Sequence, residues 1–399
     1  MTSQMPQRTN GHHASRRVRM VEVSATKLMP VIAARVGGCV SLGQGVPSFA
    51  TPPHVVEAVS RALREDPSAG KYSLQPGLPA LRQAVAEGLS RDKGLAYSPE
   101  TEVAVTVGAM EALLCAMLAF VDRGDEVILP APCYASHIEQ VQLAEGLPVF
   151  VPLKASDWGL DAEAVRRAIT PRTRAIVLCS PGNPTGAVFA EEDLAAVCAL
   201  AVEHDLIVIS DETYDYVTYG RSMPASPATL PGMRERTVVI NSFSKKYALT
   251  GWRVGYMAAA EPLMADLLKI HDASAICAPT PSQHAALAGL NGPRSIADDM
   301  RQALERRREL CCRRLDELGD YFDYVAPQGA FYVMARYGFT GASSMEVATR
   351  LIEEARVITI PGGSFGLGGE GHLRLSFGGE EREIDEAFER IGRWVKRKQ

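Results

Sequence analysis

Between residues 52 and 240, short apolar runs alternate with amphipathic segments of helical period. The runs are rich in Val and Ile and are mostly apolar on both faces, which is typical of strands in a covered parallel sheet. Pro52–Leu63, Pro79–Leu89 and Glu192–His204 each place apolar residues on one helix face. The alternation predicts a large α/β domain with right-handed crossovers and a mostly parallel sheet covered by helices. The predicted strands are Val103–Val107, Glu126–Leu129, Val149–Val151, Ala175–Cys179, Leu206–Ile209 and Val238–Ile240.

The pattern changes near residue 292. A long charged helix is predicted over Ser295–Leu318, with its run Glu305–Glu309 on a solvated face. The following segments are strand-like Phe331–Ala335, Val357–Ile360 and His372–Ser376, and a last helix over Glu383–Val395. We therefore expect a smaller C-terminal α+β domain. The predicted division is a disordered tail over 1–20, an N-terminal segment over 21–50 that packs with the small domain, a large domain over 51–291 and the small domain over 292–399.

Charge and composition favour a small-molecule enzyme. The net charge is −5, so no basic field is available to hold nucleic acid or an anionic membrane. The longest apolar run, Ala112–Val121, is too short to span a bilayer, and we expect a cytoplasmic protein. The eight cysteines form no CxxC pair and are expected to be reduced core thiols. The histidines show no metal-ligand spacing, so we expect no metal.

The segment Ser242–Arg253 carries the sharpest chemical signal. It gathers two serines, a lysine at 245, a second lysine at 246 and an arginine within one short stretch after a predicted strand. Serine hydroxyls and a guanidinium suit a phosphate, and a lysine in such a buried segment can lose its proton and attack an aldehyde. Alternatively, the segment is a basic surface loop.

Three further segments follow predicted strands. Ser180–Gly186 contains Asn183 and lies where open α/β sheets bind ligands, although a simple tight turn explains it as well. Ser210–Tyr214 begins near a buried strand end, and one helical turn would aim Asp211 and Tyr214 the same way. An N-cap aspartate with a packing tyrosine is the alternative. Val107–Ala112 joins a strand to a helix whose free N–H groups suit a phosphate.

The order and spacing of these four segments resemble the class I/II aminotransferases of pyridoxal 5′-phosphate (PLP) fold type I, the aspartate aminotransferase-like family. The resemblance covers roughly residues 20 to 396. It implies that Lys245 is the Schiff-base lysine, with the adjacent Lys246 pointing elsewhere. It also implies a set of phosphate ligands: Ser242, Ser244, Arg253 and the backbone amides of Ala109 and Met110.

The resemblance implies further roles around the cofactor ring. Asp211 would pair with the pyridinium nitrogen, and Asn183 and Tyr214 would donate to the phenolic oxygen. Tyr134 would stack on the ring, although a core aromatic is the alternative. The catalytic set is thus Lys245, Asp211 and Tyr214.

Substrate and partner contacts are implied in the same way. Arg374 would clamp the substrate α-carboxylate, helped by the N–H of Gly45 and by Asn183. Tyr72 would reach the cofactor phosphate of a neighbouring subunit, so a homodimer with shared active sites is expected. His137 is either a pocket residue or, as we favour, a satisfied structural histidine.

The implied activity is a ping-pong aminotransferase of amino acid metabolism, which moves an α-amino group to a 2-oxo acid. Another PLP-dependent reaction on the same fold is the alternative: β- or γ-elimination, replacement, or a cyclising or oxidative biosynthetic step. The same lysine, aspartate and arginine serve all of these, so the motifs do not separate them. A non-catalytic PLP-binding regulator would need a DNA-binding domain, for which residues 1–20 are too short. The sequence leaves the amino acid, the oxo acid and the pathway open.

Overall fold

The computed structural model describes residues 13–220 and 223–397. Within them, the largest sheet has seven strands in the order β2-β8-β7-β6-β5-β3-β4. Neighbouring strands are parallel except at β8, which is antiparallel to β2 and to β7 and was not expected from the sequence. The strands are β2 (Val103–Thr106), β3 (Glu126–Ala131), β4 (Leu147–Pro152), β5 (Thr173–Cys179), β6 (Ile207–Asp211), β7 (Thr237–Ser242) and β8 (Gly255–Ala258).

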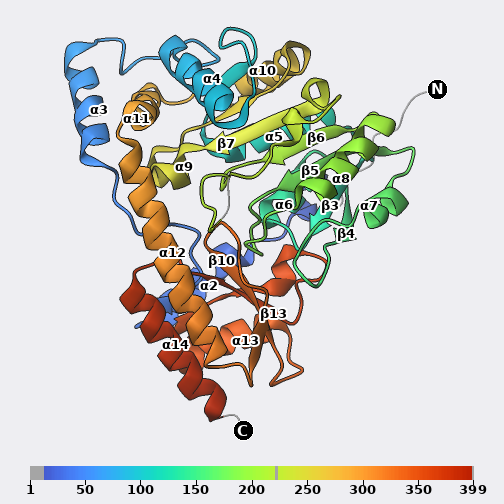
Figure 1. Ribbon diagram of the computed structural model, residues 1–399, viewed down its shortest axis with the longest axis vertical. Helices are drawn as coiled ribbons and strands as arrows, with labels where there is room; N and C mark the ends of the chain where they lie inside the picture. Colours follow the sequence, from blue (N-terminus) through green and yellow to red (C-terminus); the bar gives the residue numbers. More distant parts are fainter. Residues whose placement is uncertain (1–12, 221–222, 398–399) are drawn as a thin grey trace.

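Helices cover both faces of this sheet (Figure 1). Alternate residues of one strand enter different cores: Val127 and Leu129 pack with helices on one face, and Ile128 packs on the other. The first face is covered by α5 (Gly108–Phe120), α6 (Ala135–Leu143) and α10 (Glu261–Ala275). The other face is covered by α4 (Pro79–Lys93), α7 (Ala162–Ala168), α8 (Glu191–Glu203) and α11 (Thr280–Asn291), and α3 (Pro53–Glu65) packs against α11. This double burial explains why the central strands are mostly apolar on both faces.

A second, smaller sheet is antiparallel, with the order β12-β13-β10-β9. The long helix α12 (Arg294–Asp316) runs from the large sheet region down to this smaller unit, where it packs beside α14 (Glu381–Lys396) (Figure 1). The remaining elements of the unit are β9 (Phe322–Tyr324), β10 (Tyr332–Tyr337), β12 (Ile360–Pro361), β13 (His372–Ser376), α13 (Ser344–Arg350) and η4 (Leu351–Ala355). The predicted fold class is confirmed: a helix-covered, mostly parallel sheet with a separate small α+β region.

The N-terminal segment packs against the smaller unit. Strand β1 (Val40–Ser41) pairs in parallel with β11 (Val357–Ile358), and α2 (Ala25–Val36) buries Met29 and Ala33 in the same core. The segment then returns to the large sheet through residues 42–52. The domain boundaries at 50 and 292 remain predictions.

Residues 16–20 differ from the expected disordered tail. They form a short helix, α1 (Arg16–Met20), which contacts α6, and Arg17 lies 3.9 Å from Glu145. The contact with α6 provides the order that the polar sequence did not suggest. Residues 1–12 of the predicted tail lie outside the described part of the chain.

The charged run on α12 is only partly solvated, contrary to expectation. Arg307 is 5% exposed: its Nη1 donates to the carbonyl of Gly378 at 2.9 Å, its Nη2 lies 3.2 Å from Glu380, and its guanidinium covers the Phe49 ring. Arg306, the next residue back, is exposed. In the described residues, no helix is long and apolar enough to cross a membrane.

The buried arginine generates a stability prediction. Arg307→Ala removes hydrogen bonds of a buried cation and should lower the free energy of unfolding by about 2 kcal/mol. Arg306→Ala, the matched control on the exposed side, should change it little. Urea unfolding followed by circular dichroism measures both. Equal effects in the two variants would show that the buried contacts of Arg307 contribute nothing specific.

Candidate active site

A cavity of about 480 Å³ opens where the parallel strands of the large sheet end. Strands β2, β5, β6 and β7 point the same way, so the segments that follow them meet at one edge. Every residue predicted for the site except Tyr72 lines this cavity. These residues are Gly45, Ala109, Met110, Tyr134, Asn183, Asp211, Tyr214, Ser242, Ser244, Lys245, Arg253 and Arg374.

Lys245 enters the cavity from α9 (Phe243–Lys246), a single turn that follows β7. The Ser242 hydroxyl caps this turn by accepting from the N–H of Ser244 at 3.1 Å. The Lys245 ammonium donates to the carbonyl of Gly45 at 2.5 Å. Lys246, about 100° further round the turn, lies instead over the rings of Tyr216 and Tyr247 and does not line this cavity.

The environment of Lys245 favours its neutral form. Burial lowers the pKa of Lys245 to about 8, and the positive charges of Arg253 and Arg374 act in the same direction. Asp211 opposes them with its negative charge. A lysine with this pKa is partly deprotonated near neutral pH and can act as a nucleophile or a base.

One end of the cavity is built for an anion. Gly108 has φ +72°, and a Cβ there would lie 2.7 Å from Nη2 of Arg253, so only glycine lets the guanidinium approach this turn. The free N–H groups of Ala109 and Met110 lie in the first turn of α5. With the buried hydroxyls of Ser242 and Ser244 among the residues lining the cavity, these groups form a cradle suited to a phosphate.

Asp211 is the last residue of β6 and is 5% exposed. Its carboxylate lies 3.1 Å from Nε2 of His137 and accepts from the N–H of Thr213 at 3.2 Å. Burial raises the pKa of Asp211, but the hydrogen bond and charge of His137 outweigh it, so the pKa lies below its ordinary value. His137 contacts the carboxylate of Asp211 and is not among the residues that line the cavity. The chain continues as a turn, not the helical turn considered from the sequence.

Tyr214 and Asn183 face the cavity from two adjacent strand ends. The Tyr214 hydroxyl lies 2.9 Å from that of Tyr332, and burial raises its pKa well above the ordinary value. The Oδ1 of Asn183 accepts from Arg374 at 3.0 Å, which leaves the amide Nδ2 to donate elsewhere. Tyr134 stands edge-on to the ring of His137, with the centroids 5.4 Å apart.

Arg374, on β13 of the smaller sheet, is a buried cation without a carboxylate partner among the described residues. It is 2% exposed, donates to Asn183 and to the carbonyl of Gly43 at 2.6 Å, and lies over the ring of Tyr332 at 4.6 Å. Its Nε is buried with no hydrogen-bond partner. A buried, unpaired guanidinium is costly unless an anion completes it. This arrangement therefore calls for an anionic ligand.

Tyr72 is the one predicted site residue that the structure leaves outside the cavity. It is 79% exposed, in a segment where Leu74 is also 62% exposed. Within the described ranges, it is not among the residues that line the cavity.

Tyr332, on β10, is a cavity residue that the sequence analysis missed. It contacts both Tyr214 and Arg374, and a Cβ on Gly45 would lie 2.6 Å from its hydroxyl. Thr26, Pro30 and Val46 of the N-terminal segment also line the cavity, and the sequence did not predict this. No motif signals these residues, since long-range packing of the smaller unit and the N-terminal segment brings them there.

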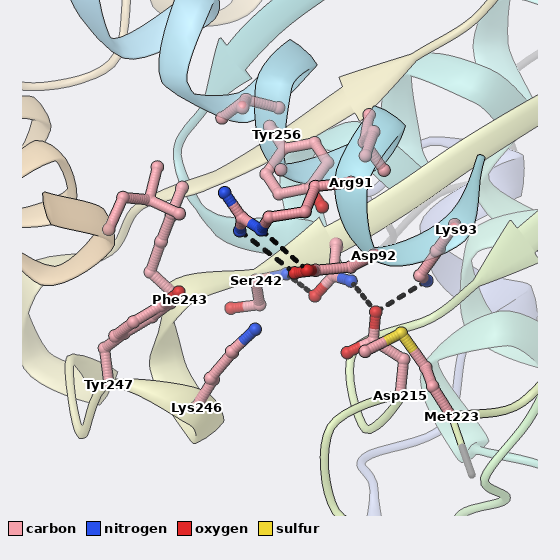
Figure 2. Close-up of a pocket in the computed structure, with 15 residues that line it drawn as sticks. Arg91, Asp92, Lys93, Asp215, Met223, Ser242, Phe243, Lys246, Tyr247 and Tyr256 are labelled. Atoms are coloured by element: carbon pink, nitrogen blue, oxygen red, sulfur yellow. Dashed lines mark hydrogen bonds and ion pairs between the residues drawn. The ribbon is translucent and has the colours of Figure 1, made fainter. Parts of the chain in front are cut away.

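A buried charge network adjoins the site, and Figure 2 shows its members Lys93, Asp215 and Ser242. The Lys93 ammonium, at the end of α4, contacts the carboxylates of Asp215, at 2.6 Å, and Glu212. Asp215 accepts from Asn241 at 2.8 Å, and the Asn241 side chain accepts from the N–H of Ser242 at 2.7 Å. Burial lowers the pKa of Lys93, but the two carboxylates raise it more, so the cation persists. The network joins the turn after β6 to the end of β7.

The residues that line the cavity fit PLP. The glycine-dependent cradle suits its phosphate, the lysine of lowered pKa suits its aldehyde, and a buried carboxylate suits its pyridine nitrogen. The unpaired guanidinium of Arg374 is left for a substrate carboxylate. No group of three or more His, Cys, Asp or Glu in the described ranges is placed to hold a metal ion.

Comparisons with known proteins agree on one family. Residues 38–391 match the family model described as aminotransferase class I and II. Aromatic-amino-acid aminotransferase 2 of Thermococcus litoralis is 38% identical, over 96% of this chain and 98% of that protein, and an aspartate aminotransferase of Pyrococcus abyssi gives the same values. The crystal structure of Thermus thermophilus aspartate aminotransferase with maleate is 38% identical, with a TM-score of 0.90 over 96% of this chain and 100% of that one.

The lowered pKa of Lys245 generates a pH prediction. Only the neutral amine attacks an aldehyde, so the rate at which the apoenzyme binds added PLP covalently should rise with pH, with a midpoint near 8. Stopped-flow absorbance of lysine-bound PLP measures the rate. Lys246→Ala is the matched control and should keep this midpoint. A midpoint near the ordinary lysine value of 10.5 would contradict the assigned environment.

Proposed function

Because the chain belongs to the class I and II aminotransferase family and is a PLP-dependent aminotransferase, we propose that the cavity at the sheet edge is its active site and that Lys245 is the lysine that binds the cofactor. An amino acid gives its α-amino group to the enzyme, leaves as a 2-oxo acid, and a second 2-oxo acid then receives the group. The observation that carries the assignment of the site is the buried, unpaired Arg374 beside a lysine of lowered pKa.

Arg374 binds the substrate α-carboxylate in this proposal. Its Nε is unused, its two terminal nitrogens are held by Asn183 and Gly43, and the Tyr332 ring fixes its plane. The guanidinium is therefore pre-oriented for a carboxylate. The N–H of Gly45, the residue whose carbonyl accepts from the Lys245 ammonium, assists in this proposal. A substrate anchored here presents its Cα toward the lysine.

Lys245 transfers the α-proton of the substrate in this proposal. Bound PLP supplies an electron sink that lets a substrate amino acid lose its α-proton. With its pKa lowered to about 8, the Nζ of Lys245 can take that proton and return it at a different atom, as amino-group transfer requires. The Asp211 carboxylate, kept ionised by His137, holds a proton on the cofactor nitrogen.

The remaining residues hold the cofactor. Ser242, Ser244 and Arg253, with the N–H groups of Ala109 and Met110, bind its phosphate. Tyr214 and the free amide of Asn183 donate to its phenolic oxygen, and Tyr134 packs on its ring. The Lys93 network fixes the turns that carry Tyr214 and Ser242.

A half-reaction tests the proposed function. A suitable amino acid, added to holoenzyme without an oxo acid, should convert the lysine-bound cofactor to its aminated form once per site and then stop, and a 2-oxo acid should reverse the change. Cofactor absorbance and the amount of keto acid released measure this. Lys245→Ala should abolish the lysine-bound absorbance, whereas Lys246→Ala should keep it. Arg374→Ala should lower kcat/KM by a transition-state loss of about 2–5 kcal/mol.

Two outcomes would contradict the proposal. Continuous release of ammonia or of a leaving group from one amino acid, without the aminated cofactor, would indicate elimination or replacement at the same site. A normal lysine-bound absorbance in Lys245→Ala would assign the cofactor to another lysine.

We also propose that the enzyme is a homodimer whose subunits share active sites. The support is the exposure of Tyr72 and Leu74, two large residues on a surface segment outside the cavity. In this proposal Tyr72 completes the phosphate cradle of the neighbouring subunit. The cytoplasmic location stays a prediction.

A mixed dimer tests the sharing of sites. One subunit carries Tyr72→Phe and the other carries Lys245→Ala, each with a different affinity tag. If Tyr72 serves its neighbour, one site keeps both intact residues, and activity should reach about half that of wild type because a two-fold dimer shares its sites reciprocally. Two impaired sites would mean that Tyr72 works within its own subunit. Failure to recover any doubly tagged species would contradict the dimer itself.

A further inference from the structure

Resting on the proposed function, we propose that the substrates carry uncharged, mainly apolar side chains and that dicarboxylates are poor substrates. The evidence is a group of side chains in the cavity lining that the proposed cofactor and α-carboxylate contacts do not use. This group consists of Thr26 and Pro30 from α2, Gln44 and Val46 from the loop after β1, and Met110 and Leu113 from α5. We call these six residues the side-chain wall.

Two helix faces make up most of the side-chain wall. Thr26 and Pro30 are four residues apart on α2, and Met110 and Leu113 are three apart on α5, so each pair points the same way. Leu113 is 1% exposed, and the sulfur of Met110 lies 3.8 Å from the Tyr134 hydroxyl, so both side chains are packed beside the proposed ring position. Methionine is flexible and polarizable and adapts to apolar groups of different shapes.

The cations of the cavity are already engaged. Of the described residues that line it, only Lys245, Arg253 and Arg374 are Lys, Arg or His. In the proposed function, Lys245 and Arg253 serve the cofactor and Arg374 binds the α-carboxylate, so each of these cations already has a role. Among the described residues of this chain that line the cavity, no further cation is left for a second substrate carboxylate, which disfavours its binding.

A positively charged substrate side chain is disfavoured by the same reasoning. Asp211 is the one acidic residue among the described residues that line the cavity, and its carboxylate is already held by His137 and Thr213. Gln44 and Thr26 offer polar groups without charge. The side-chain wall thus matches side chains such as those of leucine, methionine or phenylalanine.

Holoenzyme kinetics test this specificity. The half-reaction is measured with leucine, methionine and phenylalanine, and with aspartate, glutamate and lysine. The apolar group should show kcat/KM values at least about tenfold higher. Aspartate or glutamate as the best substrate would overturn the inference and indicate a cation from a second copy of the chain. If no amino acid converts the lysine-bound cofactor, the proposed function itself fails, a result distinct from a reversed preference.

A variant pair tests whether the side-chain wall contacts the substrate. Val46 is 46% exposed, so a longer side chain can be accommodated there. Val46→Lys adds a cation, and Val46→Met matches its length without charge. The kcat/KM ratio of aspartate to leucine should rise about tenfold or more in Val46→Lys and stay near wild type in Val46→Met. Equal ratios in the two variants would overturn the assignment of this wall to the substrate side chain.

Discussion

The common direction of the strands in the large sheet is the constraint on which the site depends. In a parallel sheet, the carboxyl ends of all strands meet at one edge, so any segment that follows a strand is delivered there. The turn at Gly108, called here the glycine turn, follows β2. Asn183 follows β5, Asp211 ends β6 and Lys245 follows β7. Residues far apart in the chain therefore surround one cavity without special long-range contacts. Strand β8 runs the other way and contributes Gly255, whose lack of a side chain lets β7 and the glycine turn come close.

An excess of positively charged side chains makes the cavity at this sheet edge suitable for an anionic ligand. Three cations and one carboxylate line the cavity in the described residues, and the carboxylate is already bound by His137. Burial and the remaining positive charge lower the pKa of Lys245, and this charge suits a phosphate and a carboxylate together. The burial of Arg374 destabilises the protein unless an anion completes it. The same buried charge therefore links ligand binding to stability and to the reactivity of the lysine.

The site residues that directly follow strands could be predicted from the sequence, because short apolar runs mark where each strand ends. The family resemblance pointed to Lys245 and not to Lys246, which lies over the Tyr216 ring outside the cavity. Arg307 was misjudged because a charged run looks solvated until Phe49, from the distant N-terminal segment, packs on it. The role of Tyr72 stays a prediction, because the neighbouring subunit that it would serve is not part of a single chain.

Tyr332 could not be predicted, because its place in the site depends on the pairing of β10 with β13 in the smaller sheet. In the antiparallel pair β10–β13, Tyr332 lies opposite Ser376 and Met334 lies opposite Arg374, so Tyr332 and Arg374 are diagonal neighbours on one face. This register places the ring over the guanidinium at 4.6 Å, and no sequence motif encodes it. The arginine is thereby fixed to the smaller sheet, while Lys245 is fixed to the large one. The relative position of the two sheets consequently sets the distance between a bound carboxylate and the lysine, and the Tyr214–Tyr332 hydrogen bond joins them at that point.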